Sequence, residues 1–229
     1  MSAIAPVSHI QNVDPGPFCH ADIVARCRTT LSANPPLADR DMDAAPDRGD
    51  HDLNPGTMPG MFADTKKRAA VLLGIVDRPD GPTIVLTRRS QHLKSHAGQI
   101  ALPGGKIDRS DSGPEAAALR ESHEEVGLDP TLADPLGYLD LYETGTGYRV
   151  VPVVVSVASG FEPVPEPGEV DAIFEMPVAI LADRGRFEKN MRVFRGQTRY
   201  FYAIRYGDHY IWGATAGILR NFHDRVFAS

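Results

Sequence analysis

The sequence has few cysteines, no long apolar run and no secretory signal. Only two of its 229 residues are cysteines, Cys19 and Cys27, which are too few to staple a small secreted scaffold. No stretch approaches the roughly 18 apolar residues of a membrane-spanning helix. The first residues also lack the basic start and apolar core of a secretory signal. We therefore expect reduced thiols, a cytoplasmic location and no membrane partner.

Positive charge is also in deficit. Lys and Arg number 24 against 30 Asp and Glu, which gives a formal net charge of −6. This balance argues against broad electrostatic binding to nucleic acid, although a local basic pocket for a small phosphorylated ligand is compatible with it. A hydrophobic fraction of 42% and a charged fraction of 24% are ordinary for a globular protein.

The most informative stretch covers residues 102–128 and reads LPGGKIDRSDSGPEAAALRESHEEVGL. A Pro-Gly-Gly turn leads through a polar loop into a predicted helix that Gly127 can end in a left-handed conformation. At 100° per residue, Glu121, Glu124 and Glu125 fall within about 100° of arc on one helix face.

Three like charges on one helix face repel each other by roughly 0.2–0.5 kcal/mol per pair. A hard divalent cation such as Mg²⁺ or Mn²⁺ would turn this repulsion into a binding site, because such ions prefer oxygen ligands. The alternative is an exposed acidic helix with an Arg120–Glu124 ion pair. We expect the carboxylate face to point to solvent, so that Glu125→Gln would have little effect on the fold and, if the face binds a catalytic cation, would abolish turnover.

The stretch resembles the Nudix box, G-x5-E-x7-R-E-U-x-E-E-x-G-U, in which U is aliphatic. Gly105 opens it, and residues 120–128 close it as RESHEEVGL. Asp111 stands where the first Glu is expected, with eight residues rather than seven between it and Arg120, and Ser122 replaces an aliphatic residue. The resemblance implies a hydrolase in which Glu121, Glu124 and Glu125 hold Mg²⁺ or Mn²⁺ and Arg120 orients Glu121.

A second resemblance lies just upstream. The coenzyme A pyrophosphatase branch of the Nudix family carries a motif close to L-L-T-x-R-[SA]-x3-R-x3-G-x3-F-P-G-G. This chain has VLTRRS at 85–90, then Lys94, Gly98 and LPGG at 102–105. Lys94 keeps the charge of the expected Arg without its planar fork. The predicted substrate contacts, which include a cationic wall for phosphates, are Arg88, Arg89, Lys94, Gly98, Gly104 and Gly105.

The remaining chain predicts a mixed sheet. Apolar runs at 69–77 and 83–87 flank a Pro-Asp-Gly-Pro turn and predict a hairpin. Pro152 falls inside a second long run, which predicts an edge strand or a bulge. Strands interrupted by helices favour an α/β protein with helices on both faces of the sheet. The resemblance implies the Nudix-type α/β/α sandwich.

Two further segments have open roles. Glu169 precedes a short predicted strand, and the resemblance makes it a candidate base or metal ligand, against a solvated turn residue. The arginine-rich segment 184–205 predicts a charged hairpin, with a second phosphate contact as the alternative.

The N-terminal part is predicted to be an extension, residues 1–62. Apolar residues at positions 18, 23, 24, 27 and 31 predict one amphipathic helix over about 18–31. A Pro-, Asp- and Gly-rich linker over 34–60 then leads to a Nudix hydrolase domain over 63–229, with its box at 105–128. The helix is too short to form its own core, so we expect it to pack on the main domain or on a second copy in a homodimer.

Together the motifs predict hydrolysis of the pyrophosphate linkage in coenzyme A or its derivatives, to 4′-phosphopantetheine and adenosine 3′,5′-bisphosphate. One alternative is a Nudix hydrolase of ADP-ribose, dinucleotides or nucleoside triphosphates. Another is a catalytically inactive nucleotide-binding regulatory module, against which the three intact glutamates argue. A third is that the N-terminal helix is a protein-interaction element.

Overall fold

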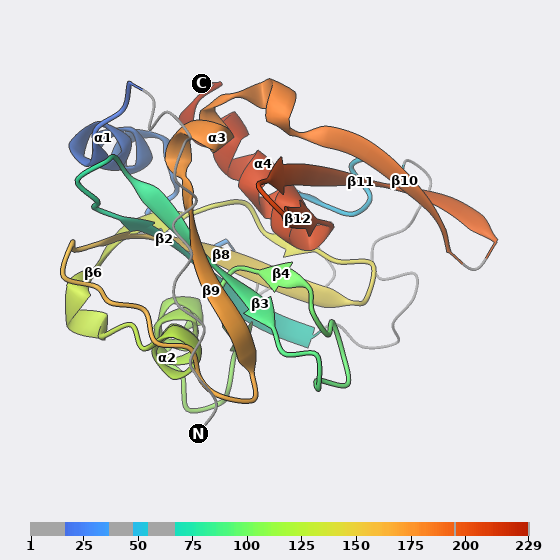
Figure 1. Cartoon of the computed structure of the whole chain (residues 1–229), viewed down its shortest axis with the longest axis horizontal. Helices are drawn as coiled ribbons and strands as arrows, with labels where there is room; N and C mark the ends of the chain where they lie inside the picture. Colours follow the sequence, from blue (N-terminus) through green and yellow to red (C-terminus); the bar gives the residue numbers. More distant parts are fainter. Residues whose placement is uncertain (1–16, 37–47, 55–66, 195, 229) are drawn as a thin grey trace.

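The computed structural model describes residues 17–36, 48–54, 67–194 and 196–228, which form a mixed β-sheet between two layers of helices (Figure 1). Helix α2 (Pro114–Val126) covers one face, and α1 (His20–Thr30), α3 (Val178–Ala182) and α4 (Ala214–Val226) cover the other. The predicted α/β/α sandwich is confirmed. Among the described residues, no helix is long and apolar enough to cross a membrane.

The centre of the sheet is a parallel pair of strands. β2 (Lys67–Val76) and β8 (Tyr148–Val157) run in register over their whole lengths. β3 (Thr83–Arg89) returns beside β2 as the predicted hairpin, and β9 (Val170–Pro177) pairs with β3. Shorter strands complete this sheet: β1 (Arg48–Gly49), β4 (Ile100–Ala101), β5 (Gly104–Lys106), β6 (Ala133–Tyr138) and β7 (Tyr142–Glu143).

Strand β8 is central, so the predicted edge position of Pro152 is wrong. Pro152 lies opposite Val71 of β2 and is flanked by β6 and β7 on its other side. A proline is tolerated here because its missing N–H falls in the gap between these two antiparallel partners. The carbonyl of Pro152 still accepts a hydrogen bond from the Leu139 N–H (3.1 Å).

The core is split by β2, whose successive side chains point to opposite faces. Ala70 and Leu72 pack on the α2 side, where Ala117 is fully buried. Leu73 and Phe222 belong to the larger core under α1, α3 and α4. The small side chains on the buried face of α2 let that helix lie close to the sheet, which brings its carboxylates to the end of β5.

Helix α2 ends at the predicted glycine, and a proline begins it. Pro114 takes its first position, where a missing N–H costs little. Gly127 ends it at φ 70°, and its N–H donates to the His123 carbonyl (3.1 Å).

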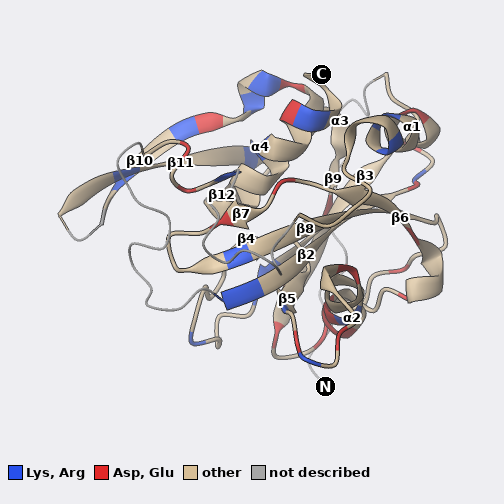
Figure 2. Ribbon diagram, turned by 180° about the vertical axis from the view of Figure 1, so that it is seen from behind, with Lys and Arg blue, Asp and Glu red and all other residues tan. Residues whose placement is uncertain are grey.

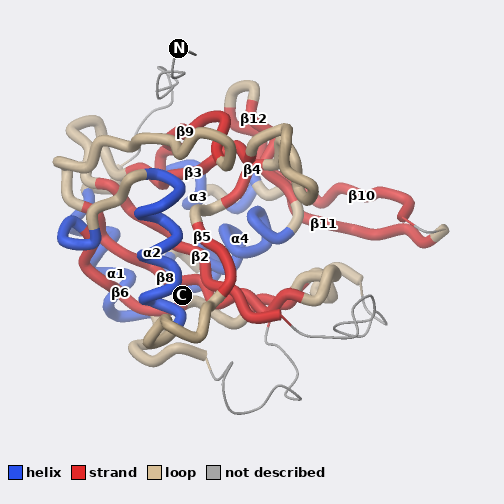
Figure 3. The backbone as a smooth tube through the Cα atoms, turned by 90° about the horizontal axis from the view of Figure 1, so that it is seen from below, coloured by secondary structure: helices blue, strands red, loops and turns tan. Residues whose placement is uncertain are grey.

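A second, three-stranded sheet consists of β10 (Glu188–Phe194), β11 (Gln197–Tyr206) and β12 (His209–Trp212). Its β10–β11 hairpin projects from the body of the molecule (Figure 3). This is the hairpin predicted within 184–205. Arg205 pairs there with Glu188 at 3.6 Å, on the exposed surface.

The N-terminal helix packs on the main domain. Phe18 meets Phe227 with ring centroids 5.4 Å apart, and Arg28 pairs with Asp134 at 2.7 Å. Residues 48–54 then follow the sheet, and the Asn54 side chain bonds the backbone of Tyr200. Residues 1–16, and residues 37–47 and 55–60 of the predicted linker, lie outside the described part of the chain.

Candidate active site

The glycine turn lies directly under the helix carboxylates. Gly104 pairs with Val71 of β2 and has a backbone φ of 149°. A side chain on Gly104 would overlap the backbone of β2. Its N–H donates to Glu125 Oε2 (3.0 Å). A Cβ on Gly105 would overlap the carboxylate of Glu121. Both glycines are therefore needed for this close approach, and they lie against a carboxylate cluster, defined as Glu121, Glu124 and Glu125. Figure 2 shows Asp and Glu positions in red along α2.

The three carboxylates differ in burial. The exposed side-chain fractions are 55% for Glu124, 19% for Glu121 and 5% for Glu125. The prediction that this face points to solvent is therefore wrong for Glu125. Glu125 follows Ser122 by three positions, so both lie on the helix face turned toward the sheet, and Ser122 is fully buried.

Arg120 is the hub of the polar contacts. Its Nε and Nη2 donate to the two oxygens of Asp111 at 3.0 and 3.1 Å. Its Nη1 donates to Glu121 (3.0 Å) and Glu124 (3.2 Å), and its Nη2 also reaches the Lys106 carbonyl (3.2 Å). The hydrogen bond from Arg120 lowers the pKa of Asp111. Asp111 thus contacts the guanidinium that holds two of the carboxylates.

Arg88 and Arg89 do not form one wall, because they lie on opposite faces of β3. Arg89 Nη1 is 3.6 Å from Glu125 Oε1, on the α2 side. Arg88 Nη2 is 3.2 Å from His209 Nδ1, and His209 stacks on the ring of Phe174. The predicted cationic wall is therefore divided, and Arg89 is the member beside the carboxylate cluster.

The loop after β3 positions Lys94 and Gly98. Gly98 adopts φ 68°, and its N–H donates to the Arg89 carbonyl (3.0 Å), which closes the loop. A Cβ on Gly98 would meet the Gln91 side chain, so the glycine is needed for the shape of the loop. Lys94 is exposed, and no ion pair joins it to any other residue of the described ranges.

Glu169 lies within electrostatic reach of the cluster. The loop that carries it is joined to neighbouring elements through backbone bonds from the Glu166 N–H to the Glu125 carbonyl (3.1 Å) and from the Ser90 N–H to the Glu169 carbonyl (2.8 Å). Its charge contributes to raised pKa values at both Glu121 and Glu125. The structure thus brings Glu169 near the box, with its own side chain exposed.

The pKa values of two glutamates in the carboxylate cluster are raised, because the neighbouring positive groups only partly offset burial and the negative charge. Burial raises the pKa of Glu125 to about 7, and the charges of Glu121 and Glu169 add to the rise. The Gly104 N–H and the Arg89 charge act in the opposite direction. Burial also raises the pKa of Glu121. A hard divalent cation suits such a set of crowded oxygen donors.

The carboxylates are at present held by protein groups. Within the described ranges, no three Asp, Glu, His or Cys side chains converge as a ready-made metal site. Glu121 and Glu124 both accept hydrogen bonds from Arg120, and Glu125 lies beside Arg89.

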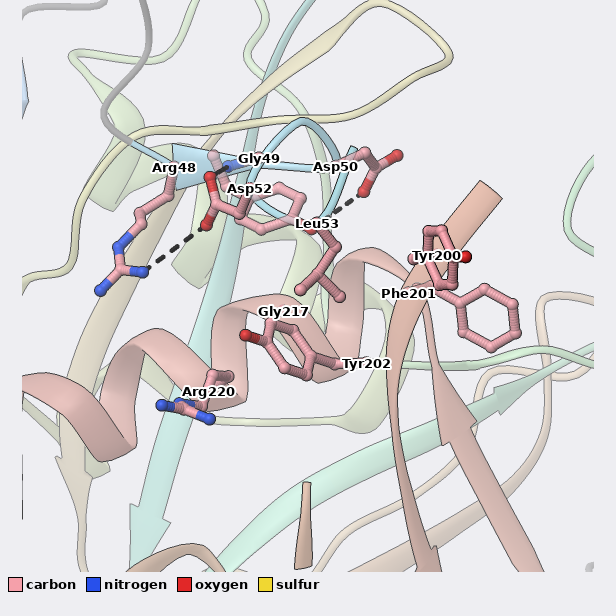
Figure 4. A pocket seen from close by; sticks show the side chains of 12 residues that line it. Arg48, Gly49, Asp50, Asp52, Leu53, Tyr200, Phe201, Tyr202, Gly217 and Arg220 are labelled. Atoms are coloured by element: carbon pink, nitrogen blue, oxygen red, sulfur yellow. Dashed lines mark hydrogen bonds and ion pairs between the residues drawn. The ribbon is translucent and has the colours of Figure 1, made fainter. Parts of the chain in front are cut away.

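A small pocket elsewhere is lined by residues of the segment 48–53 other than His51, by Tyr142, and by residues of β11, α4 and the turn before α4 (Figure 4). Its arginines already have partners, since Arg48 and Arg220 both pair with Asp224, at 3.0 and 2.8 Å. The pocket thus lies where the N-terminal segment docks, away from the carboxylate cluster.

Sequence reasoning missed two contacts of the site. The Arg89–Glu125 pair and the Arg88–His209 contact join residues far apart in the chain, and no spacing rule reports such contacts. The ion pair between Asp111 and Arg120 was also missed, because the two residues lie nine positions apart and only the fold of the loop brings them together.

Comparison with known proteins supports one family. The NUDIX domain matches residues 66–195. A protein of Escherichia coli (strain K12), named uncharacterized Nudix hydrolase NudL, is 42% identical over 154 residues, which cover 67% of this chain and 80% of the relative. The crystal structure of a Nudix hydrolase from M. smegmatis, RenU, aligns at 25% identity with a TM-score of 0.44, over 52% of this chain and 75% of that one. A C. elegans Ap4A hydrolase aligns at 19% identity with a TM-score of 0.42, over 50% of this chain and 83% of that one. The domain match and the extended identity to NudL show that the chain belongs to the Nudix hydrolase family.

Proposed function

We propose that the protein hydrolyses the pyrophosphate linkage of coenzyme A or its derivatives, to 4′-phosphopantetheine and adenosine 3′,5′-bisphosphate. The observation that carries this proposal is the contact between the two motifs. Arg89, from the upstream motif, lies 3.6 Å from Glu125 of the box, and Gly104 bonds the same carboxylate. This contact supports the proposal, because Arg89 resembles a residue of the coenzyme A branch and Glu125 resembles a residue of the hydrolytic box.

Nudix hydrolases generally use divalent metal ions such as Mg²⁺ or Mn²⁺. We propose that Glu121, Glu124 and Glu125 hold the ion. It would supply neutralisation of the pyrophosphate charge and a lowered pKa for a bound water. Arg120, anchored by Asp111, keeps Glu121 and Glu124 oriented through charge-assisted hydrogen bonds.

The remaining site residues are assigned to the substrate. Arg89 and Lys94 would contact phosphate oxygens, and the absent side chains of Gly104 and Gly105 keep that approach open. Arg88 faces His209, so we assign it to a part of the substrate away from the reacting phosphates. Glu169 is proposed separately, as a general base or a further metal ligand, because its charge helps to raise the pKa of both Glu121 and Glu125.

We also propose a cytoplasmic location. Cys19 and Cys27 are both free thiols, as expected for a reducing compartment. The homodimer stays a prediction, to be checked by mass measurement in solution.

The experiment that tests the substrate is product identification by mass spectrometry. The purified protein is incubated with coenzyme A, ADP-ribose or a nucleoside triphosphate, with Mg²⁺ or Mn²⁺ and with chelator. We expect metal-dependent 4′-phosphopantetheine ahead of the products of the other two compounds. Preferred cleavage of ADP-ribose would reject coenzyme A as the substrate while keeping Nudix chemistry. Binding without any cleavage would favour the regulatory module.

A further inference from the structure

Both oxygens of Glu125 face protein donors. Oε2 accepts the Gly104 N–H at 3.0 Å, and Oε1 faces Arg89 Nη1 at 3.6 Å. The Glu125 side chain is only 5% exposed. A carboxylate buried to this degree needs a counter-charge when it is ionised. Arg89 supplies that charge in the protein without a cation.

Arg89 is held loosely in this role. The separation of 3.6 Å is longer than the 2.7–2.9 Å typical of a charge-assisted hydrogen bond. Its Nε is buried and finds no hydrogen-bond partner among the described residues. Arg120, in the same cluster, donates to Asp111, Glu121, Glu124 and the Lys106 carbonyl. Of the two arginines, Arg120 is fixed by its bonds and Arg89 is not.

The backbone of Arg89, by contrast, is fixed. Its N–H donates to the Gln99 carbonyl (2.9 Å), and its own carbonyl accepts from the Gly98 N–H (3.0 Å). The Arg89 side chain is 30% exposed, so part of it borders solvent. A change of side-chain rotamer can therefore move the charge between partners without moving the strand.

We propose that Arg89 exchanges partners. It neutralises Glu125 before a divalent cation is bound, and it is released to a substrate phosphate once Glu125 has taken the cation. The substrate gains its contact with Arg89 only after the cation is in place. This inference rests on the proposed function, since it takes Glu125 as a cation ligand and a pyrophosphate compound as the substrate.

The exchange predicts the sign of a binding effect. If Arg89 competes with the cation for Glu125, then removing its charge tightens cation binding. If Arg89 instead held Glu125 in the geometry that binds the cation, then its removal would weaken cation binding. The two roles therefore have opposite outcomes in an experiment that needs no substrate.

The first test measures Mn²⁺ affinity by isothermal titration calorimetry in the absence of substrate. R89M should bind Mn²⁺ on the order of tenfold more tightly than the wild-type protein, since a like charge has been removed from the site. R89K keeps the charge and should stay close to the wild type. R88M is the matched control, because the neighbouring residue undergoes the same change on the opposite face of β3, and its Mn²⁺ affinity should not change. Equal or weaker Mn²⁺ binding by R89M, or wild-type protein that binds no Mn²⁺, overturns the proposal.

The second test measures binding of a coenzyme A analogue in which a methylene group replaces the bridging oxygen. Mn²⁺ should increase the affinity of the wild-type protein for this analogue far more than that of R89M. An equal increase in both proteins overturns the exchange. A failure of the substrate assignment gives a different result. If the protein cleaves ADP-ribose rather than coenzyme A, and R89M still binds Mn²⁺ more tightly, the substrate assignment is rejected and the exchange is kept. Cleavage of coenzyme A with unchanged Mn²⁺ binding in R89M would instead keep the substrate assignment and reject the exchange.

Discussion

Asp111 and Arg120 form a bidentate ion pair, with Nε–Oδ1 and Nη2–Oδ2 distances of 3.0 and 3.1 Å. The Asp111 side chain is only 5% exposed, so water does little to weaken the pair. The remaining donor of the guanidinium, Nη1, contacts Glu121 and Glu124. Asp111 therefore acts on Glu121 and Glu124 through Arg120, which contacts all three carboxylates.

Replacing Asp111 should reduce activity through Arg120. In D111A the guanidinium loses two hydrogen bonds and no longer holds Glu121 and Glu124 in one arrangement. We expect a 10- to 100-fold loss, about the size seen when partners of metal ligands are removed, with a matching loss of Mn²⁺ affinity. The control is D108A, because Asp108 lies 3.8 Å from the same arginine with a side chain 64% exposed. A D111A variant that kept wild-type Mn²⁺ affinity would contradict this role.

Glu125→Gln should stabilise the metal-free protein at alkaline pH. The pKa of Glu125 is about 7 when folded, against an ordinary value of 4.5, so the native state holds its proton longer than the unfolded chain. Stability is therefore lost as pH rises from 4.5 through 7, and a neutral Gln escapes this loss. At about 1.4 kcal/mol per pKa unit, the difference at pH 8 is on the order of 1–3 kcal/mol, and it should vanish near pH 4.5.

Urea denaturation in the presence of EDTA, at pH 4.5 and pH 8, measures this difference. The Gly104 N–H can still bond to the Gln carbonyl, so the fold should persist. Turnover should nevertheless be abolished in E125Q, since the proposed metal ligand has lost its charge. A wild-type protein that is the more stable of the two at pH 8 would refute the buried-charge argument.

Ser122→Ala should stabilise the protein. Ser122 is fully buried, and its Oγ has no hydrogen-bond partner within the described ranges. Removing a buried, unsatisfied hydroxyl recovers its desolvation cost, for which we expect about 0.5–1.5 kcal/mol after the small cavity is counted. Thermal and urea unfolding measure the gain, with S95A on the exposed loop as the control. A loss of stability in S122A would indicate a partner for this hydroxyl.

Gly105→Ala should damage the site more than the fold. The added methyl group would overlap the Glu121 carboxylate and push it from its bond with Arg120. We expect at least about a tenfold loss of Mn²⁺ affinity, comparable with losing a ligand's supporting partner. Gly113→Ala is the control, since φ is 166° there and a Cβ at Gly113 meets nothing within 4 Å. Similar losses in both variants would show that the effect is not local to Glu121.

The elements that the sequence predicted well have strong local signals. Gly127 marks the end of α2, and the Pro-Asp-Gly-Pro turn marks the β2–β3 hairpin. The burial of Glu125 depends on how α2 is rotated on the sheet. That rotation follows from distant packing partners such as Leu72, which periodicity within the helix does not report.

Other differences arose from the interpretation of single residues. The prediction ended the strand at Thr87, so Arg88 and Arg89 were treated as loop residues of one wall. The strand continues to Arg89, and its alternation sends the two side chains to opposite faces. An edge or a bulge was predicted for Pro152 because proline lacks the N–H of a strand ladder. The structure instead accommodates it at the break between β6 and β7, which depends on those neighbouring strands. The sequence of β8 itself carries no sign of it.

The parallel pairing of β2 with β8 also affects how the molecule folds. Lys67 lies opposite Tyr148, so closing this pair encloses the glycine turn and the whole of α2 in one loop. Such a closure has a larger entropy cost than a hairpin turn, and chains rich in long-range pairings fold slowly. Glu121 and Glu125 come into contact with Gly104 and Gly105 only when α2 packs on β2 and β5. A divalent cation would therefore find its ligands in the native state alone, and its binding energy would add to the free energy of unfolding.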